Sequence, residues 1–87
     1  MGEITILETT VDRVINDQVV LMNCEKNAFH TLNETGSFTW NLIKEGTKNK
    51  DDLIDRIVEE YDVEKKTAEE DLDELLRGLE ENGIIHL

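Results

Sequence analysis

Short apolar runs separated by polar turn residues occupy the first third of the chain, a pattern typical of β-strands. The runs cover residues 11–15, 19–22 and 28–32. Asn16-Asp17 separates the first two runs, and both residues tolerate the positive φ that a tight hairpin turn requires. The pattern therefore predicts a three-stranded antiparallel meander.

The third predicted strand, residues 28–32, leads directly into helical sequence, so no further strand covers its outer edge. Proteins either protect such an open edge with charge or use it for pairing. Phe29-His30-Thr31 carries no charge at neutral pH, which favours use of this edge for pairing.

From residue 33 onward, apolar residues recur every three or four positions, which predicts three helices. The first is expected over residues 34–44, between the N-cap residue Asn33 and Gly46, a residue type that commonly ends helices in the left-handed conformation. The second helix is expected to begin near Asn49 and the third near Glu64. Residues 84–85 are expected to fold back on the core.

The order of these elements predicts an α+β, winged-helix-like fold, in which a three-stranded antiparallel sheet is followed by three helices. At 87 residues, the chain is expected to form a single domain over residues 1–87. Asn33, Gly36 and Trp40 are expected to fix the corner between the third strand and the first helix. Gly36 lies in the first helical turn, where Gly costs stability relative to Ala, so it indicates a close approach of the backbone.

Charge is distributed unevenly along the chain. The formal net charge is −12, and residues 51–82 carry 14 acidic and 4 basic side chains. A surface of this charge repels phosphate, which disfavours binding to nucleic acid. Two interpretations stay open, a well-solvated helical surface and the attraction of a basic partner.

The cysteine count and the hydropathy pattern bear on the compartment. Cys24 is the single cysteine, which excludes an intramolecular disulfide and is typical of a reducing compartment. No apolar run approaches the about 18 residues of a membrane span. We therefore expect a cytoplasmic protein that does not associate with membranes.

The polar residues form no catalytic or metal-binding pattern. His30 and His86 have no Cys, His or carboxylate at the spacing of metal ligands. Cys24 lies beside Glu25, an environment that disfavours a thiolate nucleophile. Neither a phosphate-binding Gly-rich loop nor a Ser-His-Asp arrangement occurs. The sequence predicts a protein that is not an enzyme and has no metal or cofactor.

Several stretches resemble the PqqD family. They are Val19-Val20-Leu21-Met22, the twelve residues Phe29-His30-Thr31-Leu32-Asn33-Glu34-Thr35-Gly36-Ser37-Phe38-Thr39-Trp40, Tyr61-Asp62-Val63, and Asp71-Leu72 followed by Leu75, Leu79 and Gly83-Ile84-Ile85. The resemblance covers about residues 11–87, nearly the whole chain. That family includes the pyrroloquinoline quinone biosynthesis protein D and the stand-alone leader-binding proteins of lasso-peptide pathways. Their shared domain is the RiPP precursor peptide recognition element.

The resemblance implies that the chain binds the leader segment of a ribosomally made precursor peptide as an added strand. The leader would lie between the third strand and the third helix. Carried onto this sequence, the expected peptide-binding residues are Ala28, Phe29, His30, Thr31, Leu32, Asp71, Glu74, Leu75 and Gly78.

These residues have different expected roles. Leu75 would offer an apolar floor, Gly78 would leave room for a bulky leader side chain, and the acids Asp71 and Glu74 would attract Lys or Arg of the leader. Phe29 or His30 would line one wall. A shift of one residue exchanges the two faces of a strand, so the sequence leaves open which of the two faces the groove.

The partners implied by the resemblance are the precursor peptide and a separate enzyme, either a leader peptidase or a radical-SAM enzyme, in natural-product biosynthesis. Two alternatives remain. One is an acidic adaptor that binds a protein through its helical face. The other is a winged-helix DNA-binding module, which the single Arg77 among the acids of the third helix disfavours.

Overall fold

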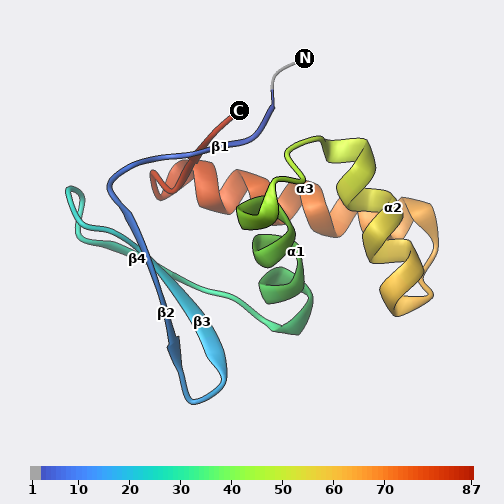
Figure 1. Cartoon of the computed structure of the whole chain (residues 1–87), viewed down its shortest axis with the longest axis horizontal. Helices are drawn as coiled ribbons and strands as arrows, with labels where there is room; N and C mark the ends of the chain where they lie inside the picture. Colours follow the sequence, from blue (N-terminus) through green and yellow to red (C-terminus); the bar gives the residue numbers. More distant parts are fainter. Residues whose placement is uncertain (1–2) are drawn as a thin grey trace.

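The computed structural model describes residues 3–87, so the first two residues of the expected domain lie outside the described residues. Over this range the chain forms three α-helices and two antiparallel sheets (Figure 1). β2 (Thr10–Ile15), β3 (Gln18–Asn23) and β4 (Ala28–Thr31) form a meander in that order, while β1 (Thr5–Ile6) pairs with β5 (Ile85–His86). The predicted α+β architecture and its meander are confirmed. The small β1–β5 sheet was not predicted, because two-residue strands show no periodicity.

The β2–β3 hairpin has the predicted turn. Asn16 and Asp17 both have positive φ, 51° and 66°, and Ile15 pairs with Gln18 across the turn. Two consecutive residues with positive φ match the right-handed twist of the flanking strands.

The three helices begin close to the predicted positions, and the first also ends where it was expected to end. α1 (Glu34–Glu45) is capped by Asn33, whose Oδ1 accepts a hydrogen bond from Gly36 N at 2.7 Å, and it ends at Gly46 with a φ of 118°. α2 (Lys50–Tyr61) is capped by Asn49, and α3 (Lys65–Glu81) begins after Glu64. A Cβ at Gly36 would lie 3.4 Å from Leu32 Cβ and 3.1 Å from Asn33 Oδ1, which is the close approach that its position indicated.

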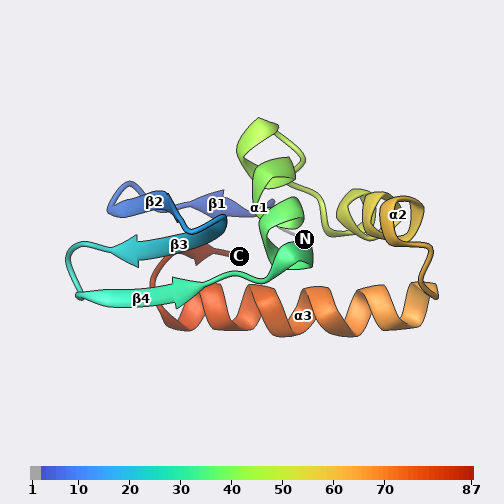
Figure 2. The ribbon, with the colours of Figure 1, turned by 90° about the horizontal axis from the view of Figure 1, so that it is seen from below.

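The core lies between the inner face of the meander, the three helices and the segment that follows α3. Its largest fully buried apolar side chains are Leu21, Leu32, Trp40, Ile43, Leu53, Leu72, Leu79, Ile84 and Ile85. The expected return of residues 84–85 to the core is confirmed. Figure 2 shows β4 running alongside the C-terminal half of α3, while α2 lies at the other end of that helix. Among residues 3–87, no helix has the length and hydrophobicity that crossing a membrane requires.

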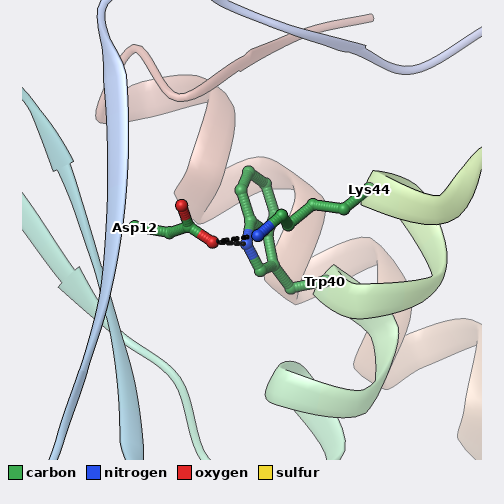
Figure 3. A network of polar contacts seen from close by, with 3 residues as sticks. All are labelled: Asp12, Trp40 and Lys44. Carbon is green, nitrogen blue, oxygen red and sulfur yellow. Dashed lines mark hydrogen bonds and ion pairs between the residues drawn. The ribbon is translucent and has the colours of Figure 1, made fainter.

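Trp40 connects α1 to β2 rather than to β4 (Figure 3). Its indole Nε1 donates to Asp12 Oδ2 at 3.3 Å, and Lys44 Nζ donates to the same oxygen. The hydrogen bond from Lys44 holds the pKa of the Asp12 carboxyl below its ordinary value of 3.8. Asn33 and Gly36 therefore lie at the expected corner, whereas Trp40 attaches the far strand of the meander to the helices.

Candidate functional site

The outer edge of β4 carries backbone groups that point away from the sheet. Leu32 N donates to Val19 O, opposite it in the register, at 2.8 Å. Neighbouring residues of an antiparallel strand turn their N–H and C=O groups to opposite sides. Phe29 and Thr31 therefore direct theirs away from β3. Within the described part of the chain β3 is the one neighbour of β4 in its sheet, so these groups form a free edge.

The register also decides the orientation that the sequence left open. His30 lies opposite the buried Leu21, so its side chain is on the inner face of the sheet, toward the helices. Phe29 lies opposite Met22 on the outer face and is 63% exposed. Of the two, His30 faces the helices and Phe29 faces away from them.

A groove of about 340 Å³ lies between the end of β4, the first turns of α1 and the middle of α3. This volume is at the lower end of the range that ligand sites occupy. Polar residues and aliphatic residues both line it. They are His30, Thr31, Leu32, Asn33, Thr35, Gly36, Thr39, Ile57, Asp71, Leu72, Glu74 and Leu75.

The structure brings six of the nine sequence-predicted site residues together around this groove. They are His30, Thr31, Leu32, Asp71, Glu74 and Leu75. Ala28 is half-buried, opposite Asn23, and Phe29 is on the far face of the sheet.

Six further residues line the groove and were not in the predicted set. They are Asn33, Thr35, Gly36, Thr39, Ile57 and Leu72. Thr35 and Thr39 are four residues apart, so both lie on one face of the first helix. This spacing is the sequence feature from which the helix α1 side of the groove could have been predicted. Thr39 is buried, and its Oγ1 donates to Thr35 O at 2.9 Å.

In this structure, without a leader peptide, a side chain of the chain itself occupies the space over Gly78 that was expected to receive a leader side chain. A Cβ at position 78 would lie 3.0 Å from His30 Cε1, so the imidazole covers this glycine. Asn82 Nδ2 donates to Gly78 O at 3.0 Å and lies 3.2 Å from His30 Nδ1. Because this amide nitrogen is a donor, it can hydrogen-bond to an unprotonated Nδ1 of the ring.

Comparison with known proteins assigns the chain to a family. Residues 18–85 match the family described as coenzyme PQQ synthesis protein D (PqqD). The chain belongs to the PqqD family. The resemblance stated from the sequence is thereby confirmed.

Two solved structures share the fold of this PqqD-family chain. "TbiB1 in Complex with the TbiA(beta) Leader Peptide" is 33% identical, with a TM-score of 0.84 and 94% of each chain covered. "Lasso peptide synthetase B1 complexed with the leader peptide" is 23% identical, with a TM-score of 0.86, and the match covers 99% of this chain and 100% of the other. No curated protein matches the chain significantly.

The groove in this PqqD-family chain combines an aliphatic floor with a polar rim. Its deepest residues are aliphatic, with Leu32, Ile57 and Leu72 buried and Leu75 half-buried. Asp71 and Glu74 are exposed at its rim on α3. A free strand edge, an apolar floor and an acidic rim together suit an extended peptide with apolar and basic side chains.

Proposed function

We propose that this chain binds the leader segment of a ribosomally made precursor peptide by strand addition to β4 and presents it to a separate enzyme. In this proposal residues 1–87 act in the cytoplasm as one peptide-recognition domain without catalytic activity of their own. The observation that carries it is the position of the groove directly beside the free Phe29 and Thr31 edge. The leader-peptide complexes of both similar structures support it.

Strand addition divides the recognition between backbone and side chains. The N–H and C=O groups of Phe29 and Thr31 would pair with the backbone of the leader, whatever its sequence. Alternate leader side chains would then enter the groove, where Leu72 and Leu75 receive apolar groups. Asp71 and Glu74 at the rim would attract a Lys or Arg.

The partner enzyme is a leader peptidase or a radical-SAM enzyme in this proposal. A leader held as a strand on β4 has its two ends free, so the segment that follows it stays available to another protein. The chain would therefore raise the local concentration of the precursor near the enzyme, as linked binding modules do.

Titration of the isotope-labelled chain with two leader peptides tests binding. One is the synthetic TbiA(beta) leader, and the other is the leader of any short precursor reading frame that is found beside the gene for this chain. We expect amide shifts concentrated in residues 28–32 and 67–78. If neither peptide shifts these amides, the proposal is wrong.

Thr31→Pro tests strand addition itself, because it removes one outward N–H from the β4 edge. We expect the affinity for the leader to fall about tenfold, since one hydrogen bond and the close fit of the strand are lost. Val14→Pro is the matched control. Val14 is 70% exposed on β2 and turns its N–H outward at the opposite edge of the same sheet.

The control should bind the leader as the wild type does. Amide spectra of both variants establish that the fold persists. Unchanged binding by a folded Thr31→Pro variant would exclude the β4 edge and favour an adaptor that uses its helical face.

A further inference from the structure

The outer face of the meander, opposite the groove, carries a row of apolar side chains. Val11, Met22 and Phe29 lie directly opposite one another on the three adjacent strands. Val11 and Met22 are half-buried, whereas Phe29, at the end of the row on the free edge, is 63% exposed. The row therefore ends where the proposed guest strand would continue it.

Backbone geometry fixes which guest side chains reach this face. Successive side chains of a strand point to opposite faces of the sheet. A peptide paired with β4 therefore directs every second side chain into the groove beside His30, and the intervening ones to the outer face beside Phe29. Directly opposed side chains have Cβ atoms about 4.5–5.5 Å apart, within contact distance of an aromatic ring.

We infer that Phe29 is a specificity-determining residue that contacts a large apolar side chain of the leader. That leader residue is adjacent in sequence to one whose side chain enters the groove. The inference rests on the proposed function. It adds a second recognition position on the other face of the sheet, whereas the sequence had left open whether Phe29 or His30 lines the groove.

The chemistry of the outer face selects an apolar occupant over a basic one. The row of Phe29 is uncharged, and the next row across the same face is Arg13, Val20 and Thr31. Arg13 is exposed, and its charge disfavours a Lys or Arg nearby. The acids Asp71 and Glu74 line the groove, on the helical side of the sheet. The two faces therefore prefer different residues, with basic groups near the groove and an aliphatic or aromatic one beside Phe29.

Binding of the tighter of the two leader peptides to Phe29→Ser tests the contact. We expect the affinity to fall about two- to fivefold, the effect of one cross-strand apolar pair. Ile15→Ser is the control, because Ile15 is 53% exposed on the same face but lies on β2, away from the free β4 edge. The control variant should bind the leader as the wild type does. Because both substitutions are at exposed positions, both variants should keep the fold.

Double-mutant cycles locate the guest side chain. Each single-alanine variant of the peptide is titrated against the wild type, Phe29→Ser and Leu75→Ala. We expect Phe29 to couple to leader positions that are adjacent in sequence to those that couple to Leu75. The coupling should change the affinity by a factor of about two or more. Coupling of both residues to the same positions, or none for Phe29, would overturn the inference and leave the proposed function standing.

Two other outcomes have separate meanings. If the peptide-free chain dimerises and Phe29→Ser abolishes the dimer, the apolar row is a contact between copies and the inference is wrong. If Thr31→Pro binds the peptide as tightly as the wild type, strand addition itself fails.

Discussion

Within residues 3–87 the meander has a free edge on each side, and the two edges differ in what lies beside them. On β4, Phe29 and Thr31 turn their N–H and C=O groups outward, next to the groove. On β2, the same alternation turns Asp12 and Val14 outward. Asp12 is held by Trp40 and Lys44 of α1, and Val14 is 70% exposed near the tip of the hairpin.

This difference indicates what makes a strand edge a recognition site. Both edges offer the same backbone hydrogen bonds, which carry no preference for sequence. Charge near an edge discourages pairing, and β2 carries Asp12 and Arg13 where β4 carries uncharged residues. Only an edge beside a groove has pockets for alternate side chains. The comparison therefore predicts that changes beside β4 affect leader binding and that similar changes on β2 do not.

The largest effect beyond the backbone test is expected from Leu75→Asp. Leu75 is half-buried in the groove, so the change removes an apolar contact and places a charge where the leader would exclude water. We expect the affinity for the leader to fall tenfold or more in a calorimetric titration. Ile15→Asp makes the same kind of change on β2, where Ile15 is 53% exposed, and should leave binding unchanged.

Equal losses in these two variants would show that acidity anywhere on the surface weakens binding, and the comparison of the edges would fail. The amide spectrum of Leu75→Asp establishes that it is folded. Leu75→Ala adds no charge, so it should also lower the affinity for the leader, but by less than Leu75→Asp.

A smaller effect is expected from Gly78→Ala, which acts through His30. Ala is favoured over Gly in a helix by up to about 1 kcal/mol. The new Cβ would, however, lie 3.0 Å from His30 Cε1 and displace the imidazole toward the groove. We expect leader affinity to fall about two- to fivefold, a loss of up to about 1 kcal/mol. In a His30→Ala background the same change should have no effect on affinity, since no ring remains to be displaced. Equal losses in both backgrounds would show that His30 does not transmit the effect.

His30 and Gly78 also show where prediction from the sequence ends. Hairpin turns, helix caps and the order of the elements follow from local chemistry, and Asn16-Asp17, Asn33 and Gly46 all have the expected roles. The face on which His30 lies depends on the pairing of β4 with β3, which a shift of one residue reverses. The covering of Gly78 by the imidazole depends on how β4 packs against α3. No local pattern encodes either contact.

The groove residues follow the same division. Leu75, Asp71 and Glu74 lie on one face of a helix, so their spacing predicts that they come together. Ile57 of α2 and Thr39 of α1 join them through tertiary packing alone. Trp40 likewise bonds to Asp12, 28 residues away in the chain, a partner that no spacing predicts.

The smallest effect is expected from Asp12→Asn on β2. Lys44 lowers the pKa of the Asp12 carboxyl, so the charged form is favoured in the folded state. The pair is partly exposed, and such pairs contribute at most about 1 kcal/mol. The contribution is present above pH 3.8, the ordinary value, and is lost as the pH falls through the lower folded-state pKa. Urea unfolding should therefore show the variant slightly less stable than the wild type at pH 7 and equally stable in strong acid.

Asn can still accept the hydrogen bond from Trp40, so the substitution isolates the ionic contribution of Lys44. Asp17→Asn, in the turn of the same hairpin, removes an equal charge at an exposed site and should leave stability nearly unchanged. Neither change should affect the affinity for the leader, because Asp12 and Asp17 belong to the side of the meander that has no groove beside it. A loss of affinity in Asp12→Asn would show that the attachment of β2 to α1 controls the β4 side, and the two edges would then be coupled rather than independent.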